Sequence, residues 1–149
     1  MLLNGFMTDA LDQAIAAEKR GEVPVGAVLV SPEGQLLAAA GNQVEADHDP
    51  TAHAEMLVLR HAAKQLGSTR LTGCDLWVTL EPCAMCAAAI SHARIRRLYF
   101  GATDAKGGGV EHGARIFSQP TCHHIPEIYG GIEARRSSRL LKAFFARRR

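Results

Sequence analysis

Long apolar runs, aromatic residues and cysteines are all scarce in this 149-residue sequence. No apolar run reaches the roughly 20 residues that a membrane-spanning helix needs, so we expect no membrane partner. Five phenylalanines, two tyrosines and one tryptophan are too few for extended stacking along single-stranded RNA. Four cysteines without a secretion signal favour metal or thiol chemistry over a disulfide framework, so we expect a cytoplasmic protein.

Linkers, repeats and low-complexity tracts are missing as well, so we predict that residues 1–149 form a single domain. The net charge is only +2, but the charges are unevenly distributed. Seven basic residues and no acidic residue lie between Arg135 and Arg149. This cluster suits a polyanion, although a solvated helix end with charges favourable at its C-terminus would explain it as well. A second basic group consists of Arg94, Arg96 and Arg97.

Strand-like and helix-like segments alternate along the chain. The β-branched or apolar stretches 23–30, 35–40, 75–80 and 97–101 are typical of strands. Helices are expected from a cap at Thr8 to residue 20, along a segment that stops at Gly67, over 83–92, and around 140–145. This alternation predicts an α/β fold, a three-layer α/β/α sandwich.

Two short motifs indicate the chemistry: His53-Ala54-Glu55 and Pro82-Cys83-Ala84-Met85-Cys86. Together they offer an imidazole and two thiolates, which are preferred zinc ligands, and one carboxylate that need not be a ligand. Three protein ligands leave a fourth coordination position open, which is typical of catalytic zinc sites. Cys83 and Cys86 are three residues apart, so one helical turn presents both sulfurs on one side, and Pro82 suits the first position of that helix.

The order of elements predicts that the two motifs meet. A helix of about 14 residues is roughly 21 Å long, and the following strand of about six residues retraces roughly 20 Å. The start of the third helix therefore arrives beside the start of the second. We expect His53, Cys83 and Cys86 to meet at the carboxyl edge of the sheet, with Glu55 reaching over the open position.

Two other zinc or thiol roles have to be weighed. A structural zinc site would need a fourth ligand, and Cys74 and Cys122 are the free candidates, but neither has ligand spacing. A redox role for Cys83 and Cys86 would leave His53 and Glu55 unexplained. The combined pattern favours catalytic zinc. The histidine-x-glutamate and proline-cysteine-x-x-cysteine pair is itself a known signature of zinc nucleobase deaminases. In such a reaction Glu55 would move a proton from water to a ring nitrogen of the base while ammonia is expelled.

Several longer segments resemble the bacterial tRNA-specific adenosine deaminases, which belong to the cytidine deaminase-like superfamily. The resemblance spans nearly the whole chain and rests on residues 22–28, Asn42, 49–55, 79–86, 100–106 and 144–148. It weakens between Gly107 and His123. There, Gly108-Gly109-Val110-Glu111-His112-Gly113 replaces a G-A-x-G-S stretch, and Cys122-His123-His124 replaces an Asn-His pair.

The resemblance implies a five-stranded mixed sheet, a homodimer, and conversion of the wobble adenosine in the anticodon loop of an arginine tRNA to inosine. It also implies that Asn42 contacts the target nucleoside. Asp104, Lys106 and His124 would contact flanking anticodon nucleotides, partly across the dimer interface. The expected cofactor is Zn²⁺ alone, with no organic cofactor.

Two alternatives of other classes remain on the residues alone. A free guanine, cytosine or cytidine deaminase would use the same zinc machinery, although the basic C-terminal cluster and Asp104-Ala105-Lys106 favour an RNA substrate. A non-catalytic, zinc-stabilised RNA-binding module is disfavoured by Glu55, because such a module needs no carboxylate beside its metal.

Overall fold

The computed structural model describes residues 5–148. The elements in chain order are α1 (Gly5–Lys19), β1 (Gly26–Val30), β2 (Leu36–Gly41), α2 (Ala54–Leu66), β3 (Asp75–Leu80), α3 (Ala84–His92), β4 (Arg97–Ala102), the 3-10 turn η1 (Ile116–Ser118), β5 (Glu127–Tyr129) and α4 (Ala134–Ala146). Within residues 5–148, no helix combines the length and apolar character that crossing a bilayer requires.

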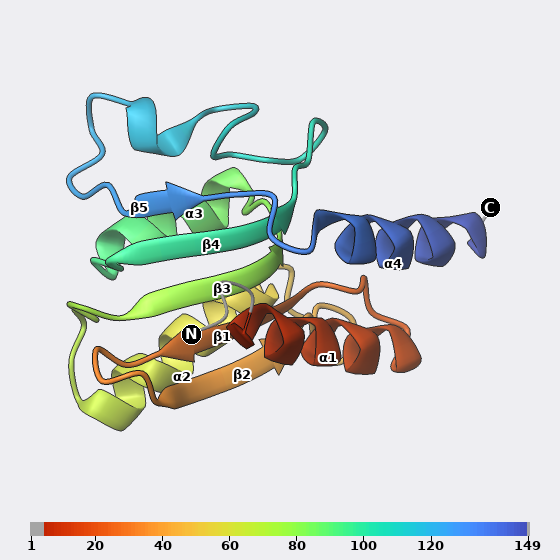
Figure 1. The fold of residues 1–149 in the computed structure, drawn as a ribbon, viewed down its shortest axis with the longest axis horizontal. Helices are drawn as coiled ribbons and strands as arrows, with labels where there is room; N and C mark the ends of the chain where they lie inside the picture. Colours follow the sequence, from red (N-terminus) through yellow and green to blue (C-terminus); the bar gives the residue numbers. More distant parts are fainter. Residues whose placement is uncertain (1–4, 149) are drawn as a thin grey trace.

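The five strands form one mixed sheet in the order β2-β1-β3-β4-β5 (Figure 1). β1 runs antiparallel to both β2 and β3, whereas β3, β4 and β5 are parallel. The carboxyl ends of β3 and β4 therefore lie at the same edge. Ligands of open α/β sheets bind outside such an edge, so this topology determines where a site can form.

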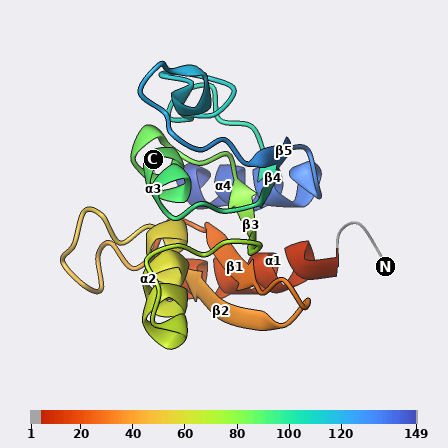
Figure 2. The ribbon, with the colours of Figure 1, turned by 90° about the vertical axis from the view of Figure 1, so that its left-hand side faces the viewer.

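Helices cover both faces of the sheet, with α2 and α3 on one side and α1 and α4 on the other (Figure 2). Alternate residues of β1 separate the two cores. Ala27 and Leu29 pack in the larger core with α2 and α3, while Val28 and Val30 pack against Met7 and its neighbours in α1. The structure thus confirms the three-layer α/β/α sandwich with a five-stranded mixed sheet.

The predicted boundaries hold best for the buried elements. The strand over 75–80 and the helix stop at Gly67 are confirmed, and Gly67 adopts the left-handed conformation of a helix C-terminus with φ of 63°. The first helix is different, because it already includes Gly5 and Thr8 lies inside it rather than at its cap. Cys83 is the N-cap of α3, so Pro82 precedes the cap and is not the first helical residue.

Aromatic rings from three neighbouring strands stack on the face that α1 and α4 cover. The ring centroids of Trp77 and Tyr99 are 3.9 Å apart, and those of Tyr99 and Tyr129 are 5.1 Å apart. Phe6 of α1 contacts the other side of Trp77 at 5.9 Å. The stack ties β3, β4 and β5 together at one level of the sheet, where Trp77, Tyr99 and Tyr129 are paired in register.

Candidate metal centre and its pocket

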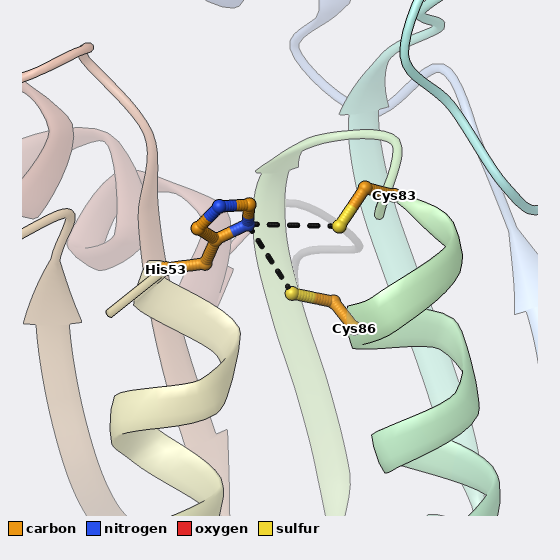
Figure 3. Close-up of side chains that lie close together, drawn as sticks. All are labelled: His53, Cys83 and Cys86. Carbon is orange, nitrogen blue, oxygen red and sulfur yellow. Dashed lines mark hydrogen bonds between the residues drawn. The ribbon is translucent and has the colours of Figure 1, made fainter. Parts of the chain in front are cut away.

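The two motifs meet at the N-terminal ends of α2 and α3 (Figure 3). His53 is the N-cap of α2 and Cys83 is the N-cap of α3, both in extended conformation, and Cys86 lies in the first turn of α3. His53 Nδ1 is 3.6 Å from Cys83 Sγ and 3.5 Å from Cys86 Sγ. All three ligand atoms lie within 4.8 Å of one another. The predicted return of the chain is therefore confirmed.

These distances fit a tetrahedral zinc ion. With Zn–N and Zn–S bonds of about 2.1 and 2.3 Å, tetrahedral angles separate a nitrogen and a sulfur by roughly 3.6 Å. The charge environment agrees, because hydrogen bonding from Cys86, aided by His53, lowers the pKa of the Cys83 thiol to about 4. Two helix N-termini face the same point and favour negative charge there. The three side chains can hold zinc without rearrangement of the backbone.

No fourth cysteine or histidine joins this group in the part of the chain that the structure describes. Cys74 is buried at the start of β3 in the larger core. The Cys122 thiol lies 3.4 Å from the Ser91 hydroxyl, toward the other end of α3. A closed structural zinc site built from these cysteines is therefore not supported, and the three-ligand arrangement matches a catalytic site.

Glu55 lies in the first turn of α2, two residues after the histidine, and is only 4% exposed. Burial raises the pKa of its carboxyl group to about 7, because an ionised carboxylate loses hydration there. At neutral pH such a group can both hold and release a proton. Cys86 is one of its hydrogen-bonding neighbours, so that proton is next to the ligand cluster.

A cavity of about 780 Å³ opens over the cluster. Its walls come from the loop between α1 and β1, the loops after β2, β3 and β4, the start of α2 and the end of α4. The residues that line it are Gly21, Glu22, Val23, Val25, Asn42, Val44, Glu45, His53, Glu55, Leu80, Glu81, Cys83, Asp104, Gly107, Phe144 and Arg148. The volume is within the range of pockets that take small organic ligands, and it admits a nucleoside.

Asn42 lines this cavity and also supports α2. Its Oδ1 atom accepts a hydrogen bond of 2.8 Å from the Ala54 N–H, a donor in the first helical turn that would otherwise be unsatisfied. The side chain therefore fixes the turn that carries His53 and Glu55. Because its oxygen is engaged by the backbone, the NH₂ group is the part of the amide available to a ligand.

Asp104 lines the cavity as well, and Lys106 lies two residues further along the same loop. The Asp104 carboxylate accepts the N–H groups of Lys106 at 3.1 Å and Gly107 at 2.9 Å, which tightens the turn. Lys106 is exposed at the rim of this loop and does not line the cavity. The structure thus brings Asp104 to the site and places Lys106 beside it.

His124 lies elsewhere. Its Nε2 atom donates to the Ile95 carbonyl at 2.7 Å, and its backbone N–H donates to the Ser91 hydroxyl at 3.3 Å. Both partners lie at or beyond the C-terminal end of α3, whereas the ligand cluster is at the N-terminal end. The structure does not bring His124 to the cavity of its own chain.

Several cavity residues were not among the predicted site residues, including Glu22, Glu81, Phe144 and Arg148. Glu81 directly precedes Pro82, and a glutamate beside a metal motif was a signal that could have identified it. Glu22 follows a turn at Gly21 and gives no such signal. Phe144 and Arg148 reach the cavity only because α4 packs back beside α1, which spacing along the sequence does not show.

Residues 2–102 match the family described as the cytidine and deoxycytidylate deaminase zinc-binding region. A tRNA-specific adenosine deaminase of Agrobacterium fabrum is 56% identical over 144 residues, which cover 97% of this chain and 94% of the relative. The chain belongs to the tRNA-specific adenosine deaminase family. Members of this family share the zinc-binding deaminase region, so zinc is the cofactor and the chain is a zinc-dependent deaminase.

Solved structures agree with this assignment. One from a study of A-to-I editing by tRNA:A34 deaminases at the wobble position is 57% identical, with a TM-score of 0.89, and covers 91% of this chain and 98% of that one. A guanine deaminase from Bacillus subtilis is 32% identical, with a TM-score of 0.67, over 85% of this chain and 83% of that one. The same fold thus also occurs in a deaminase named for a free base.

Proposed function

We propose that this deaminase hydrolyses the wobble adenosine in the anticodon loop of a tRNA to inosine and releases ammonia. The decisive observation is that Glu55 and the His53–Cys83–Cys86 group open into one cavity, in a chain 56% identical to a tRNA-specific adenosine deaminase. One water is consumed: the C–NH₂ carbon of adenine gains its oxygen, and the amine leaves as ammonia.

We assign the metal to His53, Cys83 and Cys86, and proton transfer to Glu55. Zinc bound there supplies a Lewis acid that brings the pKa of water toward neutrality. The Glu55 carboxylate accepts a proton from the attacking water and delivers it to the ring nitrogen beside the C–NH₂ carbon. The carboxylate then takes the proton of the newly added hydroxyl group and passes it to the amine, which leaves as ammonia while the C=O bond of inosine forms.

Asn42, Asp104, Lys106 and His124 are the proposed RNA contacts. Asn42 and Asp104 line the cavity, so we place the target nucleoside against the Asn42 amide and a neighbouring nucleotide against Asp104. The exposed Lys106 at the rim suits a phosphate. A single base extruded from a splayed loop fits one cavity better than a stacked strand does.

Homodimer formation, an arginine tRNA substrate and a cytoplasmic location complete the proposal. His124 lies toward the C-terminal end of α3 of its own chain, away from the cavity, so we assign its RNA contact to the substrate bound by a second subunit. Sedimentation of the protein alone and with tRNA tests the dimer.

The central test offers wild-type protein an anticodon stem-loop with a wobble adenosine and, separately, free adenosine, guanine, cytosine and cytidine. Inosine in the stem-loop product is the expected result, with release of one ammonia per inosine. The guanine deaminase fold match makes guanine the informative competitor. Ammonia released only from a free base would contradict the proposal. An E55Q variant with its zinc intact is the control for contaminating activity.

A further inference from the structure

The cavity is rich in carboxylates, which is unexpected for a pocket that accepts RNA. Its acidic lining residues are Glu22, Glu45, Glu55, Glu81 and Asp104. Among the described residues that line it, Arg148 is the single guanidinium, and no lysine ammonium accompanies it. A nucleotide within RNA brings at least one phosphate charge to the mouth of the pocket, whereas a free base brings none.

The protein's own backbone uses much of the acidic charge. Glu22 accepts the N–H groups of Glu45 and Ala46 at 3.1 and 2.8 Å. Glu81 accepts N–H groups of four residues at 2.9 to 3.1 Å; the donors are Asp104, Val110, Glu111 and His112. These bonds compensate both carboxylates within the pocket walls. The cavity therefore repels a phosphate less strongly than the number of its carboxylates suggests.

Arg148 is held in place before any substrate arrives. Its Nη2 atom donates to the Gly21 carbonyl at 3.0 Å, and its guanidinium carbon lies 4.2 Å from the centroid of the Phe144 ring. Phe144 is buried, so the ring that supports the guanidinium is fixed. Stacking uses the face of the guanidinium and leaves edge N–H groups for a bidentate contact with phosphate oxygens.

The neighbouring Arg147 is different in one respect. Its Nη2 atom lies 2.8 Å from Glu18 Oε1 of α1, and it does not line the cavity. Both arginines have the same charge and follow the same helix. One is paired with a carboxylate outside the cavity and the other faces into the cavity.

We propose that Arg148 binds the phosphate next to the target nucleotide and thereby selects a nucleotide within an RNA chain over a free base. This inference rests on the proposed RNA substrate and names the residue that distinguishes it. Arg148 contributes to substrate binding and not to proton transfer, so its loss raises KM and leaves kcat nearly unchanged.

The test compares R148Q with R147Q, because each removes one positive charge from the same turn. With the anticodon stem-loop, R148Q is expected to raise KM about tenfold to a hundredfold, with kcat within about threefold of wild type. R147Q should stay within about threefold in both constants, and R148K should lie between wild type and R148Q because it keeps the charge and loses the planar fork. Equal zinc content and equal thermal midpoints exclude misfolding.

A neutral methylphosphonate linkage beside the target adenosine identifies the contact. The neutral linkage should weaken binding by wild type and R147Q as much as the R148Q substitution weakens binding of the normal stem-loop. R148Q itself should bind the two substrates with equal affinity. The slope of log affinity against log salt should become shallower by about 0.7 in R148Q. Identical KM values for R148Q and R147Q, or a further loss for R148Q on the neutral linkage, would overturn the proposal.

Failure of the proposed reaction gives a different result. Wild-type protein that binds the stem-loop without forming inosine contradicts the proposed activity, while the Kd values of the three proteins still test Arg148.

Discussion

The first turn of α2 and the loop before α3 each place a buried glutamate in the wall of the same cavity, with opposite consequences. Glu55 is 4% exposed and Glu81 is 2% exposed. Burial raises the pKa of Glu55 to about 7. Burial would raise the pKa of Glu81 too, but hydrogen bonds from the Asp104 N–H, the His112 ring and further backbone N–H groups outweigh it and lower the pKa.

The difference teaches that donors, and not burial alone, determine the charge of a buried carboxylate. Glu81 has a full set of donors and remains ionised, so it can anchor the loop that carries Asp104 and Lys106. Hydrogen bonds from its own backbone N–H and from Cys86 lower the pKa of Glu55, but they do not outweigh the increase that desolvation causes. One side chain is suited to proton transfer and the other to holding a wall in place.

The largest expected effect concerns activity and Glu55. E55Q keeps the size of the side chain and removes the proton acceptor, so kcat should fall by a factor of about 10²–10⁴. Zinc content should be unchanged, because Glu55 is not among the three side chains proposed to hold the metal. Single-turnover inosine formation and elemental analysis measure both. Residual activity above a tenth of wild type would remove Glu55 from the mechanism.

The same substitution at the two glutamates should change stability in opposite directions. E81Q puts an amide NH₂ against N–H donors and should lower the free energy of unfolding by about 2–4 kcal/mol. E55Q removes a carboxylate that is costly to ionise and should raise it by about 1 kcal/mol at pH 8. Urea unfolding of the metal-free proteins, to which the raised pKa of Glu55 applies, provides the measurement. Equal shifts in both variants would show that the two environments do not differ.

The pH dependence of stability sharpens the comparison further. The folded-state pKa of Glu81 is lowered from 4.5, so its contribution is present above that pH and disappears as the pH falls through the lower value. In the metal-free protein the folded-state pKa of Glu55 is raised to about 7, so stability is lost as the pH rises from about 4.5 to 7. In a plot of the free energy of unfolding against pH, E81Q should reduce the loss of stability at acidic pH. E55Q should reduce the loss of stability between about pH 4.5 and 7. Equal slopes of the free energy of unfolding against acidic pH in wild type and E81Q would contradict the role given to Glu81.

The smallest expected effect concerns His112, whose ring contacts the Glu81 carboxylate. Its Nδ1 atom is 2.8 Å from Glu81 Oε1, but the side chain is 35% exposed and four backbone donors remain when the ring is removed. H112A should therefore cost about 1 kcal/mol of unfolding free energy. Differential scanning calorimetry can measure it, and a loss as large as that of E81Q would show that the ring is the main anchor.

The metal site was predictable because it depends on local spacing and one return of the chain. His53, Cys83 and Cys86 need only a helix and a strand of matching length between them. The extended N-cap conformation of His53 also explains how two residues at i and i+2 serve one centre. On a continuous helix these side chains would point apart.

Features that depend on distant packing were not predictable in the same way. β5 has three exposed residues and no alternating apolar pattern, so only the family resemblance implied a fifth strand. The helical stretch up to Gly67 was readable, but Leu66 in its last turn is exposed while the small Ala54 and Ala62 are buried. Arg96 and Arg97 belong to the second basic group of the sequence, and their pairing with Asp75 could not be read from it.

The aromatic stack gives this protein an optical reporter of its own. Trp77 is the single tryptophan of the chain, and it lies buried between Phe6 and Tyr99. Its emission therefore reports on the pairing of β3, which leads to Cys83, with β4, which leads to Asp104. Loosening of that pairing on removal of the metal can be followed by fluorescence without attaching a dye.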